Sequence, residues 1–193
     1  MDRDFWRKRY REKQWGWDLG QVSPPIKTYV DGLIDKNLRI LIPGAGQGHE
    51  AAYLWQTGFR QTYICEWAPE AVQLFKTLQP HFPDKHIFIE NFFELDIQVD
   101  LILEQTFFCA INPALRPAYA EKCAELLAPK GRVAGLLFAS PFDKPGPPFG
   151  GTKEEYLRYF TPHFDILYME ICPNSVKPRQ GNELFFELQK TQA

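Results

Sequence analysis

The fold of this chain is decided by the stretch Ile40-Leu41-Ile42-Pro43-Gly44-Ala45-Gly46-Gln47-Gly48-His49-Glu50. Its apolar start gives way to three glycines spaced two apart, and then to a helix-like segment. Glycine allows the backbone to turn tightly and to approach a ligand closely. The stretch therefore predicts a strand that passes into a helix around a nucleotide-like ligand.

An acidic residue after the next apolar run supports this prediction. Residues 61–65 are strand-like, and Glu66 follows them directly. A carboxylate at the tip of the second strand can accept hydrogen bonds from both hydroxyls of a ribose. The glycines and Glu66 together indicate a cofactor that carries adenosine.

The remaining pattern predicts a Rossmann-like α/β fold. Strand-like and helix-like runs alternate from residue 38 to residue 138, which requires a mostly parallel sheet with helices on both faces. Two closing strands have no strong helix between them and predict an antiparallel hairpin at one edge. The seven expected strands are 38–42, 61–65, 86–89, 99–103, 132–138, 164–171 and 183–188, and the expected helices are 26–34, 49–56, 69–78, 113–127 and 153–160.

The first 25 residues stand outside this alternation. Trp6 and Tyr10 are four residues apart and share one face of an expected helix. The run Ser23-Pro24-Pro25 is expected to break any helix at that point. We interpret residues 1–193 as a single domain and residues 1–25 as its N-terminal helical extension.

Composition limits the partners and the compartment. The net charge of −2 provides no global field that would recruit nucleic acid or an anionic membrane. The N-terminus is charged throughout, unlike a signal peptide, and no apolar run approaches the ~20 residues of a membrane helix. The four cysteines lack metal-ligand or redox spacing. We expect a cytoplasmic monomer with reduced thiols, no bound metal, and a small-molecule substrate.

The spacing of the glycines distinguishes between two classes of cofactor. A dinucleotide fingerprint, G-x-G-x-x-G, would need glycine where His49 stands, whereas the third glycine here is Gly48. The resulting GxGxG is the usual spacing in enzymes that use S-adenosylmethionine (SAM). Asn91 and Phe92 follow the third expected strand, where an amide can bind an adenine edge and a ring can stack on it. An oxidoreductase of the NAD type and a SAM-binding protein without activity remain the alternatives.

Several ordered motifs resemble those of the thiopurine methyltransferase superfamily, which includes thiopurine, thiol and halide/thiol methyltransferases. They are Trp6, Tyr10 and Trp17-Asp18-Leu19-Gly20, then LIPGAGQGHE at 41–50, Glu66, NFF at 91–93, EQTFFCAINP at 104–113, LAPKGR at 127–132, GPPFGG at 146–151 and SVKPRQG at 175–181. The resemblance implies a class I methyltransferase fold and methyl transfer from SAM, which becomes S-adenosylhomocysteine (SAH). It implies a small thiol or sulfide as acceptor, with a halide or a thiopurine as alternatives.

The resemblance also implies roles for single residues. Trp6, Tyr10 and Trp17 would form an aromatic lid over SAM, and Glu104 and Gln105 would lie beside the sulfonium and the acceptor. The full set of cofactor contacts that we expect is Trp6, Tyr10, Trp17, Gly44, Gly46, Gly48, Glu66, Trp67, Asn91, Phe92 and Glu104.

Methyl transfer to sulfur needs little acid–base help. A thiol has a pKa of roughly 8.5, so some thiolate exists at neutral pH. We expect Gln105 and Arg179 to steady the anion, and Glu104 either to attract the sulfonium or to fix a main-chain turn. Phe142 or Phe149, in the Pro- and Gly-rich loop 140–151, would cap a small apolar substrate.

Overall fold

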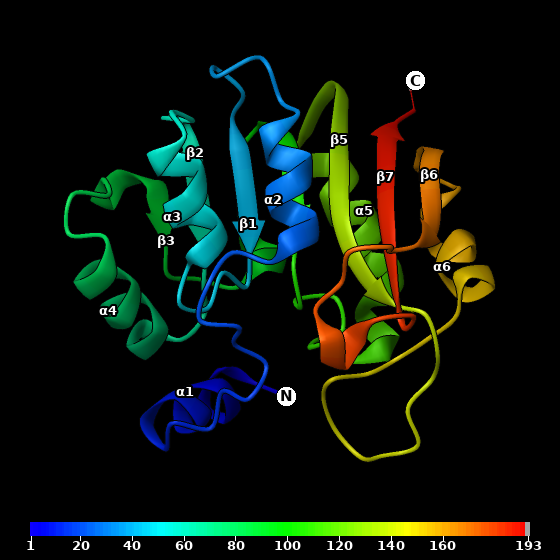
Figure 1. Ribbon diagram of the computed structural model, residues 1–193, viewed down its shortest axis with the longest axis horizontal. Coiled ribbons are helices and arrows are strands. Elements are labelled where there is room, and N and C mark those ends of the chain that lie inside the picture. Colours follow the sequence, from blue (N-terminus) through cyan, green and yellow to red (C-terminus); the bar gives the residue numbers. More distant parts are fainter. Residues whose placement is uncertain (192–193) are drawn as a thin grey trace.

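The computed structural model describes residues 1–191 and contains one seven-stranded sheet in the order β3-β2-β1-β4-β5-β7-β6 (Figure 1). Strands β1 to β5 are parallel, and β7 runs antiparallel between β5 and β6. The predicted sheet, mostly parallel with an antiparallel edge pair, is confirmed. The strands are β1 Ile40–Pro43, β2 Thr62–Cys65, β3 Ile87–Phe88, β4 Val99–Glu104, β5 Leu127–Phe138, β6 Phe164–Ile171 and β7 Glu183–Lys190.

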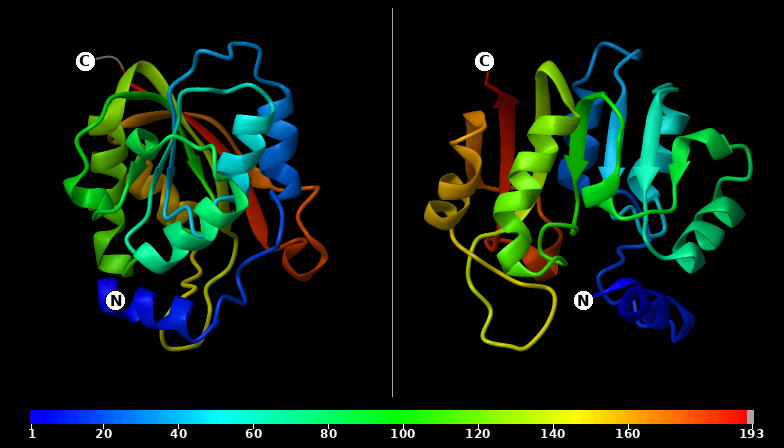
Figure 2. Two further views of the ribbon diagram at one scale, coloured as in Figure 1. Left: turned by 90° about the vertical axis from the view of Figure 1, so that its left-hand side faces the viewer. Right: turned by 180° about the vertical axis from the view of Figure 1, so that it is seen from behind.

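Helices cover both faces of the sheet, as Figure 2 shows. On one face lie α2 Pro24–Asp31, α3 His49–Gln56 and α4 Pro69–Leu78, and on the other lie α5 Arg116–Leu126 and α6 Lys153–Phe160. Successive side chains of a strand point to opposite faces. In β1, Ile40 and Ile42 therefore pack with α2 and α3, whereas Leu41 packs in the cluster that contains α5.

Two boundaries differ from the expected ones because of proline and glycine chemistry. Pro24 begins α2 rather than breaking a helix, because a proline in the first turn needs no intrahelical N–H bond. Strand β5 begins at Leu127, where Leu127 pairs with Val99, and a bulge intervenes before Arg132 pairs with Leu101. Lys130, with a φ of 62°, lies in this bulge. The left-handed conformation is one that turns also use, and here it occurs inside the strand.

Helix α1 Arg3–Arg11 lies below the sheet in Figure 1, beside α4 and on the side to which the arrows of β1 and β5 point. Asp2 caps it by accepting a hydrogen bond from the Phe5 amide at 2.9 Å. Arg7 Nε donates to Glu70 Oε1 at 3.1 Å and joins α1 to α4. We call residues 1–23 the N-terminal segment. Within residues 1–191, no helix combines the length and apolar character needed to cross a bilayer.

Candidate active site

The glycine turn after β1 takes a backbone conformation that side chains do not tolerate. Gly44, Gly46 and Gly48 have φ angles of 56°, 58° and 71°. A Cβ on Gly44 would lie 2.3 Å from the Phe107 ring, and one on Gly48 would lie 2.3 Å from the Phe75 ring. The turn therefore needs glycine both for its dihedral angles and for its close contacts.

Glu66, the first residue after β2, holds this turn from the neighbouring strand. Its Oε2 accepts a hydrogen bond from the Gly46 amide at 2.8 Å, and its Oε1 accepts one from the Ala68 amide at 2.8 Å. Burial raises the pKa of Glu66, and the hydrogen bonds from backbone amides oppose that rise. Glu66 also lines a large cavity.

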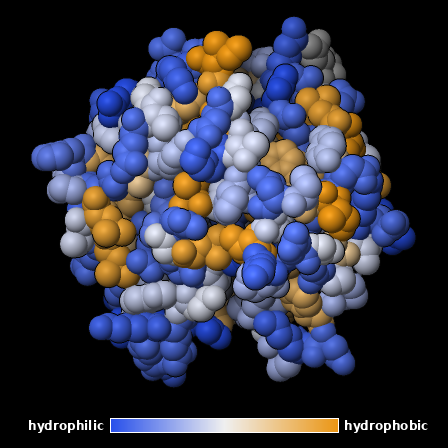
Figure 3. All heavy atoms as spheres, in the orientation of Figure 1, coloured by the Kyte–Doolittle hydropathy of each residue, from blue (hydrophilic) through white to orange (hydrophobic). Residues whose placement is uncertain are grey.

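That cavity has a volume of about 620 Å³, within the range of about 300–1,000 Å³ that is usual for small-molecule sites. Figure 3 shows the molecule hollowed at its lower edge, between the N-terminal segment and the loop 139–152. This is the carboxyl edge of the sheet, near the point between β1 and β4 where strand order reverses, and ligands of open α/β sheets bind there. The expected residues that line it are Trp6, Tyr10, Trp17, Gly44, Glu66, Trp67, Asn91, Phe92 and Arg179.

Aromatic rings form the wall that the N-terminal segment contributes. The Trp17 ring meets the rings of Trp6 and Tyr10 edge-on, at centroid distances of 5.7 and 6.0 Å. Trp15, which the motifs did not single out, packs 5.9 Å from Tyr10. Burial and the nearby Glu66 raise the pKa of Tyr10, so its phenol is neutral at physiological pH.

Asn91 and Phe92 follow β3 in the chain and line the cavity. Asn91 caps a short 3₁₀ turn by accepting a hydrogen bond from the Phe93 amide at 3.2 Å. Phe92 is buried against Phe107 and Tyr119 and is also one of the residues that line the cavity. Both residues occupy the position that the sequence predicts, with Phe92 also in the core.

Glu104, the last residue of β4, lines neither this cavity nor the smaller pocket beside it. Its Oε1 accepts hydrogen bonds from the Phe107 and Phe108 amides at 2.8 and 2.9 Å, and its Oε2 accepts one from the Tyr119 hydroxyl at 2.8 Å. Burial raises the pKa of Glu104 to about 7. Of its two expected roles, the geometry fits the second, which is to fix a main-chain turn. That turn carries Thr106, which does line the cavity.

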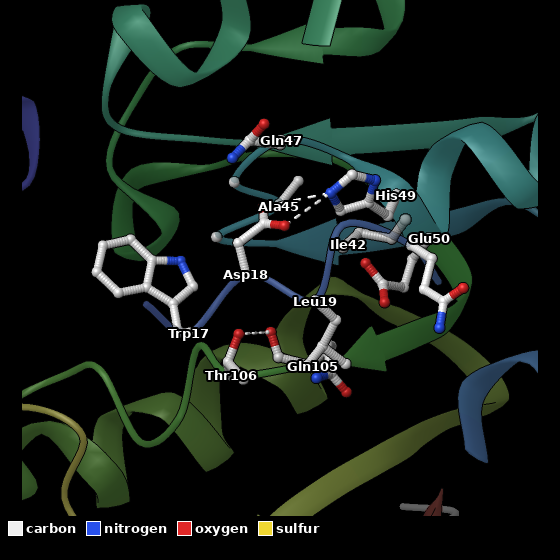
Figure 4. Close-up of a pocket in the computed structure, with 13 residues that line it drawn as sticks. Trp17, Asp18, Leu19, Ile42, Ala45, Gln47, His49, Glu50, Gln105 and Thr106 are labelled. Atoms are coloured by element: carbon white, nitrogen blue, oxygen red, sulfur yellow. Dashed lines mark hydrogen bonds and ion pairs between the residues drawn. The ribbon is translucent and has the colours of Figure 1, made fainter. Parts of the chain in front are cut away.

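Gln105 and Arg179 line different pockets. Gln105 lines only the smaller pocket, of about 40 Å³ (Figure 4), and its Oε1 accepts a hydrogen bond from Ser23 Oγ at 3.2 Å. Arg179 lines the large cavity and donates from Nη2 to the Trp17 carbonyl at 2.8 Å. Among the three expected catalytic residues, only Arg179 therefore faces the large cavity. Cys109, which also lines the large cavity, was not singled out as a site residue by the sequence.

The loop 139–152 lines the cavity through residues other than the expected phenylalanines. Lys144, Pro147 and Pro148 face the cavity, whereas Phe142 and Phe149 do not. Phe142 instead packs on Phe138, at a centroid distance of 4.8 Å. The predicted phenylalanine cap is therefore not formed, because the Phe142 ring packs on the body of the protein and Phe149 is tied down through its backbone, whose amide donates to the Cys109 carbonyl at 2.7 Å.

Arg116, at the start of α5, anchors the same loop through its backbone carbonyls. Its side chain is 1% exposed and donates to the carbonyls of Phe149 and Gly150 at 3.2 and 2.9 Å. It also forms an ion pair with Glu155 on α6 at 2.8 Å. This arginine was missed because its partners lie 33 to 39 residues further along the chain.

His49 also has an acidic partner that its sequence neighbours did not suggest. Figure 4 shows the Asp18 carboxylate facing the His49 ring, with Nε2 of His49 at 3.0 and 3.2 Å from the two carboxylate oxygens. The two residues are 31 positions apart, so no local sequence pattern pairs them. The pair connects the N-terminal segment to the first residue of α3.

Comparison with known proteins identifies the family. The sequence profile described as "Thiopurine S-methyltransferase (TPMT)" matches residues 1–187. The chain belongs to the thiopurine S-methyltransferase family. It is 31% identical over 185 residues to the Arabidopsis thaliana protein named probable thiol methyltransferase 2, covering 92% of this chain and 81% of that one. It is 25% identical over 202 residues to the thiopurine S-methyltransferase of Psychrobacter cryohalolentis, covering 91% and 92%.

A solved structure supports the fold of this thiopurine S-methyltransferase family member. The 1,6-didemethyltoxoflavin-N1-methyltransferase of Burkholderia thailandensis, crystallised with SAH, matches with a TM-score of 0.77 at 20% identity, over 98% of this chain and 87% of that one. The fold is that of a class I methyltransferase. Family membership makes the chain a SAM-dependent S-methyltransferase, and the alternative of a NAD-type oxidoreductase is set aside.

The described residues fit SAM by their chemistry. A buried carboxylate, Glu66, stands where a ribose needs an acceptor, and the glycine turn leaves no side chain in the way. Neutral aromatic rings, including Tyr10 and Trp17, suit a sulfonium cation. Within residues 1–191, no cluster of three or more His, Cys, Asp or Glu residues is arranged to hold a metal ion.

Proposed function

We propose that this enzyme transfers the methyl group of SAM to the sulfur of a small thiol or sulfide. The observation that carries the proposal is the composition of the large cavity. One part is lined by Glu66, Asn91 and Phe92, and another by Arg179 and the proline wall of the loop 139–152. The first part suits a nucleoside, and the second suits a small anion.

We assign the cofactor contacts by position in the cavity. Glu66 holds the ribose, Asn91 and Phe92 contact adenine with Trp67 nearby, and Gly44 lies against the methionine portion. SAM supplies an electrophilic methyl group on a positively charged sulfur. Trp6, Tyr10 and Trp17 would close over the sulfonium, attract its charge with their rings and exclude water. These roles remain proposals that the geometry of the cavity supports.

The acceptor would bind as a thiolate beside Arg179. No histidine is among the described residues that line the large cavity, and a thiol with a pKa of roughly 8.5 needs no strong base. A nearby guanidinium favours the anionic form, while the thiol proton passes to solvent. The enzyme then needs only to align the acceptor and to keep water out.

The cavity also contains two cysteines, Cys65 and Cys109, that must not compete with the substrate. Burial raises the pKa of Cys109 to about 12, and burial likewise raises that of Cys65. Because the thiolate is the nucleophile, both side chains stay unreactive at neutral pH. The protein can therefore line an S-methylation site with its own thiols and still methylate a solute.

We assign supporting roles to Glu104 and Gln105. Glu104 would shape the turn that presents Thr106 and Cys109 to the acceptor. Gln105 would hold Ser23 and, with it, the end of the N-terminal segment. We further propose that residues 1–193 form a single domain with residues 1–25 as its lid, and that the enzyme is a cytoplasmic monomer that binds no nucleic acid. The net charge of −2 and the four free cysteines support these assignments.

A volatile-product assay tests the proposed function. The purified enzyme is given SAM and, in turn, hydrogen sulfide, small thiols, aromatic thiols, thiocyanate and iodide. We expect the highest kcat/KM for a small thiol or hydrogen sulfide. Thiocyanate and iodide are included because Arg179 and Lys144 in the cavity suit any small soft anion. Methylation of oxygen or nitrogen acceptors alone would contradict the proposal.

A further inference from the structure

The connection between α1 and α2 is held to the body of the protein by apolar packing of Trp15, Trp17 and Val22 and by a small set of polar contacts. Residues 12–23 contain no helix or strand. Gly16 and Gly20 flank Trp17, and a Cβ at either glycine would meet nothing within 4 Å. Gly20 has a φ of 69°, in the left-handed region that favours glycine, so its backbone conformation rather than its packing calls for glycine.

The contact between Asp18 and His49 is the charged attachment of this connection. Their side chains are only 11% and 19% exposed, and His49 Nε2 lies 3.0 Å from Asp18 Oδ1. The Gly20 amide donates a second hydrogen bond to the same oxygen at 2.6 Å. A sheltered, charge-assisted hydrogen bond is stronger than a neutral one, so the pair can decide where this stretch of backbone lies.

Trp17 lies next to Asp18 and lines both the large cavity and the smaller pocket. Arg179 binds its carbonyl oxygen from the opposite end of the chain. Besides its ring contacts within the N-terminal segment, Trp17 is therefore fixed by the ion pair of its neighbour Asp18 on the α3 side and by one hydrogen bond on the Arg179 side. Figure 4 shows Trp17 and His49 on opposite sides of Asp18.

We propose that Asp18 and His49 form a latch that holds Trp17 over the cavity, which makes His49 a positioning residue for cofactor binding. The identity of the cofactor rests on the proposed function. The latch itself does not, because it concerns the position of the connection in the protein without ligand. His49 does not line the large cavity and would act only through Asp18 and Trp17.

Protonation of His49 follows from this geometry. The hydrogen bond that His49 donates to the Asp18 carboxylate raises the pKa of His49, and the charge of Glu50 on α3 raises it further. Burial would raise the pKa of Asp18, but hydrogen bonds from His49 and Gly20 outweigh it and lower that pKa. Other titratable groups near Asp18 and Trp17 are Tyr10, Glu66 and Arg179. Among these groups, His49 is the one whose ordinary pKa lies near neutrality.

The latched form therefore binds a proton that the open form releases. Protonation of His49 stabilises the latched form relative to the open form. This stabilisation is fully present below the ordinary pKa of histidine, about 6.5, and is lost as pH rises through the raised pKa of latched His49. If cofactor binding needs the latched form, the affinity for the cofactor must fall over the same pH interval. A neutral residue at position 49 must abolish this pH dependence of the affinity.

The first test uses the protein without ligand. Trypsin cleavage after Lys13, an exposed residue in the connection, is followed by mass spectrometry at pH 7 in the wild type, H49A, H49Q and D18N. We expect cleavage in H49A and D18N to be about tenfold faster, the ratio that loss of a charged hydrogen bond implies. Cleavage after the remote, exposed Lys85 serves as the internal control. Equal cleavage after Lys13 in all four proteins would overturn the latch.

The second test measures SAH affinity by calorimetry between pH 5.5 and 8. We expect the wild type and the control H81Q, at an exposed histidine, to lose affinity severalfold across this range, whereas H49Q shows a flat profile. A wild-type slope in H49Q would overturn the proposal even if H49A is too unstable to study. If the wild type binds no SAH at any pH, the proposed function fails, and the cleavage experiment alone decides the latch.

Discussion

Glu66 is the side chain on which the cofactor assignment depends most. It joins the glycine turn to the end of β2 through two amide hydrogen bonds and still faces the cavity. A ligand ribose would use the free lone pairs of the same carboxylate. Its removal would leave the Gly46 and Ala68 amides without this acceptor.

We predict that Glu66→Ala weakens SAH binding about 10- to 100-fold, since a hydrogen bond to a charged group contributes about 1.5–3 kcal/mol. Glu66→Gln should lie between the alanine variant and the wild type, because the amide keeps one acceptor oxygen. Isothermal calorimetry gives the affinities, and Glu121→Ala, on the exposed side of α5, is the control. Unchanged affinity in Glu66→Ala would remove Glu66 from the cofactor site.

Glu104 gives a second prediction, on stability. Its pKa is raised from 4.5 to about 7, so the folded protein favours the protonated carboxyl, and ionisation costs stability as pH rises from about 4.5 to above 7. That shift corresponds to about 3 kcal/mol. Glu104→Gln keeps an acceptor for the Phe107 and Phe108 amides and cannot ionise.

Glu104→Gln should therefore gain stability relative to the wild type as pH rises, with the full advantage of about 3 kcal/mol above pH 7. Urea unfolding of both proteins at pH 4.5, 6 and 8.5 measures this difference. A difference in unfolding free energy that does not change with pH would show that Glu104 is not the buried acid described here.

At the scale of single residues, the sequence predicts those contacts that a local pattern determines. Gly44 and Glu66 stand at the ends of two recognisable strands, and parallel strands bring such ends together. It cannot place the Glu104 carboxylate, because its direction depends on the main-chain turn after β4. It also cannot pair Asp18 with His49, because that contact depends on how residues 12–23 return over the sheet.

At the scale of the elements, the position of the loop 139–152 depends on a side chain from another element, Arg116 on α5. A buried cation that loses its partners is costly, and so is a carboxylate that loses a buried cation. Glu155 is about a third exposed, so solvent would screen it after a substitution. The two backbone carbonyls of the loop would lose their donor altogether.

We predict that Arg116→Met destabilises the protein by about 2 kcal/mol, a discounted cost for a partly exposed pair. It should raise KM for the acceptor more than it weakens SAH binding, because the loop lines the acceptor side. Hydrogen exchange at residues 149–151 should accelerate, whereas Arg158→Met, at an exposed position of α6, should behave as the wild type. Unaltered exchange at these residues would contradict the anchoring role.

The elements themselves are largely predictable, and the exceptions have identifiable causes. The apolar runs of β1 and β4 report burial on both faces, which is a local property of the sequence. Pro24 misleads the prediction because proline both ends and begins helices, and the residues after it decide between the two. The early start of β5 is hidden by Lys130 and Gly131, which form a bulge inside the strand rather than a turn before it.

At the scale of the whole molecule, the site is assembled from distant parts of the chain. Two connections of irregular structure, the N-terminal segment and the loop 139–152, approach the same edge of the sheet from opposite sides (Figures 1 and 2). Parallel topology places the glycine turn, Glu66 and the turn after β4 along that edge. The mostly parallel sheet follows from the sequence pattern, but the approach of these two connections depends on side-chain contacts, such as Arg179 to Trp17, that no local pattern reveals.

The central claim is that the cavity at the carboxyl edge of the sheet is the cofactor site, with acceptor space beside Arg179. A crystal structure of the enzyme soaked with SAH tests this most directly. We predict SAH in the large cavity, with its ribose hydroxyls on Glu66, its adenine against Phe92 and its sulfur directed toward the Arg179 side. SAH bound elsewhere, or a cavity that stays closed by its own side chains, would contradict the account.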